Sequence, residues 1–384
     1  MKQLLTFIII GILSWQCQSP KNQGTSEKDA DIPGIVTEKD WGELAGKPVL
    51  LYTLENENGM NIQITNFGGI IVSVNVPDKN GEMDDVVLGF GTFEEYLNKN
   101  RPYFGALIGR YANRIYEGKF TIDDTEYQLE VNSPPNHIHG GSSGFGTVVW
   151  DSKPIETMAG PGVELTYHSP DSAGGFPGNL NVVVKYTLTR DNEIMIEYEA
   201  TTDKPTILNL TNHSYFNLAG HDSGTILDQQ IKINASEITP VDENLIPTGE
   251  LMEVENSPFD FREFKTIGDY IDQEHPQLAF AGGFDHNFII RGNRGSLRTA
   301  AQVKEPTTGR ILTVYTTEPG LQFYAGNFLN GTEGKNGAVY DYRGGFCLEA
   351  QHYPNSPNIE NFPSVVLRPD EVYKQTTIYR FSVE

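Results

Sequence analysis

The chain has 384 residues, and its 28 Lys and Arg against 51 Asp and Glu give a formal net charge of −23 at pH 7. A surface of that sign repels phosphate groups, which disfavours a nucleic-acid partner and an anionic membrane surface as a partner. Hydrophobic residues form 38% of the chain and aromatic residues 11%, enough for a sizeable core and therefore evidence against wholesale disorder.

The N-terminal seventeen residues differ from the rest of the chain. Lys2 precedes an apolar run from Leu4 to Leu13, and Cys17 follows the run closely. The run is shorter than the ~20 apolar residues of a membrane-spanning helix, so it favours an export signal. We predict a signal at 1–17, a polar tether at 18–34, and export from a bacterial cytoplasm.

The end of this signal indicates a lipoprotein type. Cys17 is followed by a polar stretch, although Trp15 and Gln16 stand where such signals usually carry small residues. We expect Cys17 to be lipidated, which makes the protein periplasmic or lipid-anchored to the cell envelope and gives it no other membrane contact. Cleavage nearby without lipidation is the alternative.

Beyond the tether, short runs of alternating or β-branched residues are bounded by Asn, Asp, Gly or Pro, which is typical of antiparallel strands. These runs lie at 49–54, 61–65, 70–76, 163–168, 181–189, 193–199 and 311–317. Helical patterns are short and lie at 93–98 and 261–271. No repeat and no Pro/Ser-rich linker follows residue 33, so we expect a single all-β domain at 35–384, built as a large antiparallel β-sandwich.

The chain holds two cysteines, Cys17 and Cys347. If Cys17 is lipidated, no intramolecular disulfide is possible. Cys347 stands in the apolar segment Gly345-Phe346-Cys347-Leu348-Glu349. A thiol in such a setting usually acts as a small hydrophobe, so we interpret Cys347 as a core residue and not as a nucleophile.

Histidines give the first indication of chemistry. Several of the eight lie beside amides, carboxylates or rings, in the segments 136–141, 211–216, 284–287 and 349–352. His137 and His139 would share one face of a strand, so a metal pair is conceivable. Further ligands at metal-ligand spacing are not nearby, so a metal enzyme is the weaker hypothesis and we expect no metal.

Two other segments contain groups that suit a sugar. Gly109-Arg110-Tyr111-Ala112-Asn113-Arg114-Ile115 carries planar multi-donor groups that can bind several hydroxyls, although ion pairs with carboxylates explain them equally well. The segment 318–327 mixes amides, rings and glycines. Trp150 and Tyr215 could stack on a sugar, but core packing is the commoner use of an aromatic residue.

Taken together, these segments resemble the aldose 1-epimerases, also called galactose mutarotases, from about Gly68 to the C-terminus. The matching stretches are Ile108-Gly109-Arg110-Tyr111-Ala112-Asn113-Arg114-Ile115, Ile138-His139-Gly140-Gly141, Gly175-Phe176-Pro177-Gly178-Asn179-Leu180, Leu210-Thr211-Asn212-His213-Ser214-Tyr215-Phe216-Asn217-Leu218, Thr239-Pro240-Val241-Asp242, Gly283-Phe284-Asp285-His286, Gly320-Leu321-Gln322-Phe323-Tyr324 and Leu348-Glu349-Ala350-Gln351-His352. The resemblance implies a single β-supersandwich domain of the galactose mutarotase type, an open sugar cleft and no cofactor.

The resemblance also implies roles for individual residues. Glu349 would be the general base and His213 the general acid, and the sugar would be bound by His139, Arg114, Asn113, Asp285 and Gln322. Ring opening removes the proton of the C1 hydroxyl and protonates the ring oxygen. A Glu near its ordinary pKa of ~4.3 can accept at pH 7, and a His near ~6.5 can be held protonated and donate. His137, His286 and His352 are candidates for supporting roles.

The expected function is interconversion of the α and β anomers of free hexoses such as glucose and galactose, by a monomer or homodimer. A non-catalytic carbohydrate-binding protein on the same scaffold is the alternative, but such a binder could have lost either Glu349 or His213. An epimerase for phosphorylated hexoses is a third possibility. It would need more basic residues than Arg110 and Arg114 at the cleft, and export disfavours it.

Overall fold

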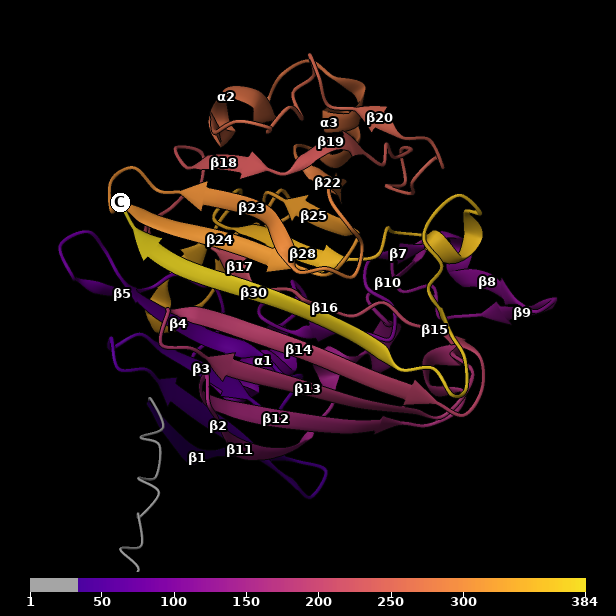
Figure 1. Cartoon of the computed structure of the whole chain (residues 1–384), viewed down its shortest axis with the longest axis horizontal. Helices are drawn as coiled ribbons and strands as arrows, with labels where there is room; N and C mark the ends of the chain where they lie inside the picture. Colours follow the sequence, from indigo (N-terminus) through magenta and orange to yellow (C-terminus); the bar gives the residue numbers. More distant parts are fainter. Residues whose placement is uncertain (1–33) are drawn as a thin grey trace, which may run out of the picture. The chain divides into compact units, whose positions relative to one another are not determined.

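The computed structural model describes residues 34–384, which belong to one unit built mainly of strands (Figure 1). Every pairing between named strands in this range is antiparallel, for example those that join neighbours in the three largest sheets. The expectation of an all-β, antiparallel fold is therefore confirmed. Cys17, the signal at 1–17 and nearly all of the tether lie outside the described residues.

The largest sheet has nine strands in the order β11-β12-β13-β14-β30-β24-β23-β18-β21. The C-terminal strand β30 lies between β14 and β24 and pairs with both. It therefore joins β11–β14 to β24, β23, β18 and β21 in one sheet. The bounds are β11 Asp151–Thr157, β12 Gly160–Ser169, β13 Leu180–Leu188, β14 Glu193–Thr202, β30 Tyr373–Val383, β24 Arg310–Thr316, β23 Arg298–Lys304, β18 Gln230–Ile233 and β21 Lys265–Thr266.

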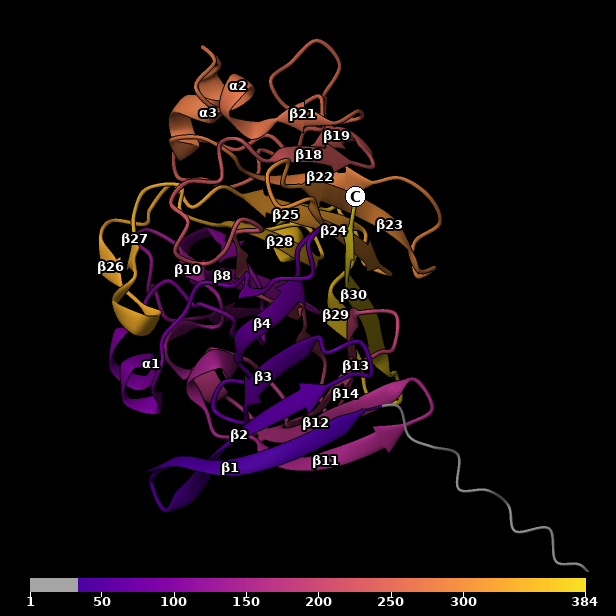
Figure 2. The same ribbon diagram turned by 90° about the vertical axis from the view of Figure 1, so that its left-hand side faces the viewer.

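Two further sheets complete the sandwich. The five-stranded sheet contains β1 Ile35–Leu44, β2 Lys47–Glu55, β3 Asn61–Thr65, β4 Ile71–Pro77 and β5 Met83–Asp85 in chain order. The six-stranded sheet contains, in spatial order, β17 Tyr215–Phe216, β28 Phe346–Gln351, β25 Gly320–Tyr324, β22 Asp285–Ile290, β19 Ala235–Ile238 and β20 Met252–Glu253. In Figure 2, β30 and β24 run along the right-hand side, with β25 and β28 to their left.

Short strand pairs and helices connect these sheets. The pairs are β6 Leu107–Ile108 with β16 Thr211–Asn212, β7 Arg114–Ile115 with β10 His137–Ile138, β8 Lys119–Ile122 with β9 Thr125–Gln128, β15 Thr206–Ile207 with β29 Val366–Leu367, and β26 Thr332–Glu333 with β27 Val339–Tyr340. The α-helices are α1 Phe93–Lys99, α2 Ile267–Ile271 and α3 Pro276–Ala281. None of the helices within residues 34–384 is long and apolar enough to cross a membrane.

Local sequence explains where the helices begin and end. Thr92 caps α1, and its side-chain oxygen accepts a hydrogen bond from the backbone N–H of Glu95. The helix predicted at 93–98 is therefore confirmed. The pattern at 261–271 is helical only at 267–271, while residues 262–263 form a bend and 265–266 form the short strand β21.

The core lies between the nine-stranded sheet and the other two. Leu54 of β2, Leu165 of β12 and Leu348 of β28 belong to one continuous buried cluster, although they come from three different sheets. Side chains alternate across a strand, so Phe346, Leu348 and Ala350 of β28 face this core. Their neighbours Cys347, Glu349 and Gln351 therefore point to the opposite face of the six-stranded sheet.

A tight turn follows β10 at the edge of that opposite face. His139 has φ 53° and Gly140 has φ 83°, both in the left-handed region. A Cβ on Gly140 would lie 1.9 Å from the carbonyl oxygen of Gly109, so there is no space for a side chain. The left-handed backbone conformation also disfavours any residue other than glycine. The turn thus packs directly against the Gly109–Arg110 backbone.

We predict that Gly140→Ala destabilises the protein more than a matched substitution in open space. Gly81 has nearly the same φ, 86°, but no heavy atom within 4 Å of its Cβ position, so Gly81→Ala incurs only the backbone strain of about 1 kcal/mol. The clash at Gly140 should add about 2 kcal/mol or more. Urea unfolding of the two variants measures the difference, and equal losses would contradict the close packing of this turn.

Candidate active site

The side chains of Glu349, Gln322 and Asp285 lie next to one another on three neighbouring strands of the six-stranded sheet. Glu349 of β28 is the register partner of Gln322 in β25, and Gln322 is paired with Asn287 in β22, two residues after Asp285. The Gln322 Nε2 donates to Asp285 Oδ1 at 2.7 Å. Because all three side chains are on the face opposite the sandwich core, the sheet itself holds a carboxylate–amide–carboxylate row.

The wall facing this row is built from β7, β10 and the segment after β16. Asn113 has φ 63°, and its backbone N–H donates to His139 Nδ1 at 3.2 Å, which joins the ends of β7 and β10. Arg114 begins β7, and its Nη1 lies 3.7 Å from Asp285 Oδ2. His213 follows β16 and lies with its Nε2 3.7 Å from Glu349 Oε2.

Between these walls lies a cavity of about 260 Å³. This is near the lower end of the ~300–1,000 Å³ of sites for drug-sized ligands, so it suits a small molecule. Its lining residues are Arg101, Pro102, Tyr103, Asn113, Arg114, Ile138, His139, His213, Tyr215, Asp285, Tyr324, Phe328, Leu329 and Glu349. Six of the seven catalytic and binding residues predicted from the sequence are in this lining, and the seventh, Gln322, is hydrogen-bonded to one of them.

Several lining residues were not among the predicted site residues. Tyr103 has φ 63°, and its ring lies 4.9 Å from the His139 ring and 6.0 Å from the His213 ring, centroid to centroid. Phe328 is 62% exposed and stacks on Tyr324 at 5.8 Å. Tyr324 stands in one of the recognised motifs, but Tyr103 and Phe328 stand in ordinary loop sequence that offers no comparable signal.

Burial is the main cause of the pKa shifts of Glu349 and His213, the two side chains at the centre of the site. Glu349 is buried, and its pKa is raised well above the ordinary value by desolvation and by the Asp285 carboxylate, with Arg114 opposing. Desolvation also lowers the pKa of His213 to about 4. The expectation that both groups stay near their ordinary pKa values is therefore wrong, because it left out the cost of removing both charges from water.

The surroundings also shift the pKa of Asp285, the second carboxyl group of the site. Desolvation raises the pKa of Asp285, while the nearby Arg114 guanidinium and the Gln322 hydrogen bond act in the opposite direction. Gln322 Oε1 and Glu349 Oε2 are buried, and neither has a hydrogen-bond partner within residues 34–384. Unsatisfied buried acceptors are rare, so a ligand with hydroxyl donors would complete this site.

His139, His213 and Glu349 offer ligand atoms that lie within 4.8 Å of one another, as in a metal centre. The hydrogen bond from the Asn113 N–H makes His139 Nδ1 an acceptor, so the neutral ring carries its proton on Nε2, the nitrogen left to meet a ligand. An N–H donor suits a hydroxyl oxygen and does not suit a metal ion. His137, the other half of the conceivable metal pair, bonds the carbonyl of Glu130 through Nδ1.

Two other residues considered from the sequence are structural. The Arg110 guanidinium is buried and donates to the carbonyls of Ser169, Pro170, Pro177 and Gly178. It is not in the cavity lining and forms no ion pair with a carboxylate of the described residues. Trp150 packs in the core against Phe145.

By contrast, Tyr215 lines the cavity, and its ring stacks on His213 at 5.1 Å. Cys347 is fully buried, which confirms its interpretation as an interior residue.

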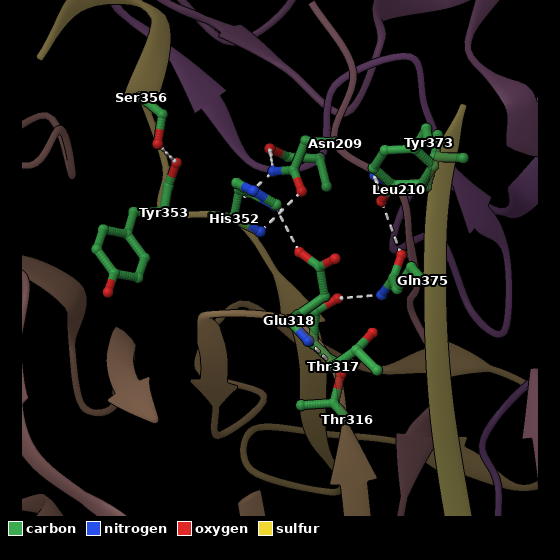
Figure 3. Close-up of polar contacts among 12 residues, drawn as sticks. Asn209, Leu210, Thr316, Thr317, Glu318, His352, Tyr353, Ser356, Tyr373 and Gln375 are labelled. Carbon is green, nitrogen blue, oxygen red and sulfur yellow. Dashed lines mark hydrogen bonds and ion pairs between the residues drawn. The ribbon is translucent and has the colours of Figure 1, made fainter. Parts of the chain in front are cut away.

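A buried polar network anchors the end of β28 (Figure 3). His352 Nδ1 lies 2.6 Å from Glu318 Oε2. Asn209 accepts from the His352 backbone N–H through Oδ1, and its Nδ2 donates to the carbonyls of His352 and Ala112. His352 is thus outside the cavity, but its network joins the strand that carries Glu349 to the segment that carries Asn113 and Arg114.

Comparison with known proteins agrees with this geometry. The model of the family described as Aldose 1-epimerase matches residues 50–380. Galactose mutarotase of Homo sapiens is 45% identical over 351 residues, which covers 91% of this chain and 99% of that protein. Aldose 1-epimerase of Escherichia coli (strain K12) is 38% identical over 341 residues, 88% of this chain and 97% of its own. The crystal structure of galactose 1-epimerase from Lactobacillus acidophilus NCFM superimposes with a TM-score of 0.81 at 32% identity, covering 91% and 99% of the two chains.

We predict that the Glu318–His352 pair stabilises the fold in a pH-dependent way. Burial by itself lowers the pKa of His352, but the Glu318 carboxylate outweighs it, and the net pKa is raised above 6.5. The contribution is therefore fully present below about pH 6.5 and is lost as the pH rises through the raised value.

The test compares unfolding free energies of the parent and His352→Gln across this range. The variant should be less stable by about 2 kcal/mol at pH 6, with a gap that narrows toward alkaline pH. His168→Gln, at an exposed histidine, is the control. A gap that does not change with pH would contradict the assignment of a charged pair.

Proposed function

This chain belongs to the aldose 1-epimerase family and interconverts the α and β anomers of free hexoses such as glucose and galactose; we propose that Glu349 is its general base and His213 its general acid. The observation that carries this proposal is the buried contact of 3.7 Å between the two side chains on the wall of the cavity. A base and an acid that flank one small cavity can act on two oxygen atoms of the same sugar carbon.

The reaction needs one proton removed and one supplied. Glu349 takes the proton of the C1 hydroxyl while His213 Nε2–H protonates the ring oxygen, and the C1–ring-oxygen bond breaks to give the open-chain aldehyde. Rotation by half a turn about C1–C2 presents the other face of the carbonyl to the ring-forming hydroxyl. The same two residues then transfer the protons back, so the ring closes as the other anomer and the enzyme is regenerated.

Burial shifts the pKa values of Glu349 and His213 in opposite directions, which decides where a proton shared by the pair is held. That proton resides mainly on Glu349 when the cavity is empty, since its pKa is raised and that of His213 is about 4. The reactive arrangement has the same proton on His213, at the same net charge. A protonated His213 with a low pKa is a strong acid, and an ionised Glu349 with a raised pKa is a strong base, so the minor arrangement is the more reactive one.

We propose that Arg114, Asn113, His139, Asp285 and Gln322 bind the sugar hydroxyls. Arg114 and the Nε2–H of His139 are donors, and Asp285 and the unpartnered Gln322 Oε1 are acceptors. A sugar hydroxyl both donates and accepts, so a wall with both kinds of group can satisfy several of them. The Tyr103, Tyr215 and Tyr324 rings supply apolar area for the C–H face of the ring.

The non-catalytic alternative has no observation in its favour, because the chain carries both members of the proposed acid/base pair and its relatives are named galactose mutarotase and aldose 1-epimerase. The oligomeric state stays a prediction of a monomer or homodimer.

The proposed roles predict large losses on removing either group. Glu349→Gln and His213→Asn keep the side-chain size but lose the proton transfer, so each should lower kcat by about 10²- to 10⁴-fold. Polarimetry of freshly dissolved α-D-glucose and α-D-galactose measures the rate over the spontaneous reaction. The matched controls are the same two substitutions at exposed residues, Glu243→Gln and His168→Asn, and we expect both to keep the parent's rate. A folded Glu349→Gln variant with the parent's rate would overturn the assignment of the base.

We further propose that the chain is exported and held at the cell envelope by a lipid on Cys17, its only contact with a membrane. The support is the charge and apolar pattern of 1–17 and the polar stretch that follows it.

This proposal predicts that the full chain, expressed in a bacterium, incorporates labelled palmitate and fractionates with membranes. Cys17→Ser should abolish both, because the thiol is the acylation site, while Cys347→Ser should leave the label unchanged. Equal labelling of the Cys17→Ser variant, or a parent protein found entirely in the soluble cytoplasmic fraction, would refute the anchor.

A further inference from the structure

The imidazole of His213 has a different polar neighbour at each nitrogen. Its Nε2 lies 3.7 Å from Glu349 Oε2, and its Nδ1 lies 3.5 Å from the sulfur of Cys347. The faces of the ring lie against Tyr215 and Tyr103, and the His139 ring meets it edge-on at 5.1 Å. Both faces of the ring thus lie against aromatic side chains, and the sulfur of Cys347 is the polar side-chain atom next to Nδ1.

The position of Cys347 follows from the strand that carries the base. Cys347 and Glu349 are two residues apart in β28, so both side chains point to the same face. Their spacing places the thiol and the carboxylate at opposite nitrogens of one imidazole. A single strand therefore sets the surroundings of both His213 nitrogens.

The thiol is a neutral partner. Desolvation raises the pKa of Cys347 well above its ordinary value, and the Glu349 carboxylate adds to this, so the sulfur keeps its proton. A thiol is a weak donor and a weak acceptor. It can accept an N–H hydrogen bond and orient a ring without adding a negative charge beside it.

The direction of the hydrogen bond between His213 Nδ1 and Cys347 Sγ depends on the tautomer of His213. In the neutral imidazole, Nε2 faces Glu349 Oε2 at 3.7 Å without a hydrogen bond, and the ring proton can be on Nδ1. When the proton of Glu349 has moved to His213, both nitrogens are protonated and Nδ1–H is unchanged. In both arrangements the Nδ1–H faces the sulfur of Cys347, and only Nε2 changes its protonation.

We propose that Cys347 is a positioning residue that accepts the Nδ1–H of His213 and thereby keeps Nε2 as the nitrogen that exchanges its proton with the sugar. This inference rests on the proposed role of His213 as the acid. It explains why a thiol suits this position better than a carboxylate. A carboxylate would stabilise the imidazolium, as the aspartate of a hydrolase triad does, and would make His213 a weaker acid.

The tautomer of His213 is the direct test. In the ¹⁵N-histidine-labelled protein, long-range ¹H–¹⁵N spectra distinguish a protonated from an unprotonated ring nitrogen, and His213→Asn assigns the signal. We expect Nδ1 of His213 to be protonated in the parent at pH 7. In Cys347→Ala, which removes the acceptor, we expect a mixture of both tautomers.

Kinetics separate hydrogen bonding from packing. Cys347→Ala and Cys347→Ser both shorten the side chain, but only serine restores an acceptor atom. Loss of orientation at His213 should lower kcat of Cys347→Ala by about 10-fold, with KM within about twofold of the parent. Cys347→Ser should recover most of this loss. A purely structural role would make the two variants equally slow and leave the tautomer unchanged.

The possible failures are distinguishable. A parent enzyme with unprotonated Nδ1 at His213, or folded Cys347→Ala and Cys347→Ser variants of equal rate, would overturn the role of Cys347 while leaving the acid/base pair intact. Full activity of His213→Asn would instead refute the role of His213 as the acid, whatever the spectra of Cys347→Ala show. Thermal unfolding of each variant verifies that the compared proteins are folded.

Discussion

The structure of this site depends on one costly feature, a carboxylate removed from water in the middle of a sheet. Glu349 Oε2 is buried without a hydrogen-bond partner in the described part of the chain, and the groups near it that are or can become cationic are the Arg114 guanidinium and the His213 and His139 rings. Burying an unpaired charge costs several kcal/mol, and this desolvation raises the pKa of Glu349 well above its ordinary value. The surrounding elements serve this condition: the sandwich core covers one face of β28, and the β7 and β10 turns and the His213 segment enclose the other.

The same condition explains the division of roles among the polar groups. The groups beside Glu349 and His213 are either neutral or balanced, since Asp285 is bonded by Gln322 and faces Arg114, and the thiol of Cys347 carries no charge. Charged pairs that only fasten the framework lie outside the cavity. The Glu318–His352 pair is such a case, because it holds the end of β28 in place without contributing a charge to the catalytic wall. Because the neighbouring groups are neutral or paired, one proton can move between Glu349, the sugar and His213 without a change in the net charge of the pair.

Sequence patterns predicted much of this arrangement, and the exceptions have definite causes. Period-two alternation located the strands at 61–65 and 193–199, because a half-buried strand imposes that period directly on the chain. The recognised motifs supplied Glu349, His213 and their binding partners. Arg110 stands in the same motif as Arg114, yet it bonds backbone carbonyls more than 50 residues away. The sequence pattern of one segment cannot show whether Arg110 or Arg114 donates hydrogen bonds to a loop that is distant in the sequence. Tyr103 was missed for the same reason, since its place over His139 and His213 depends on how three loops pack.

The amino-acid sequence by itself indicated the all-β class, the sandwich, the family and the two residues that we propose as acid and base, because these depend on periodicity and on ordered motifs that are local properties of the chain. The tertiary structure alone decided the protonation of those groups. The pKa values of Glu349 and His213 moved in opposite directions from their ordinary values, since desolvation is a property of everything packed around a group and not of its neighbours in sequence. The partner of each His213 nitrogen was decided in the same way, by the contact between the segment after β16 and the outer face of β28.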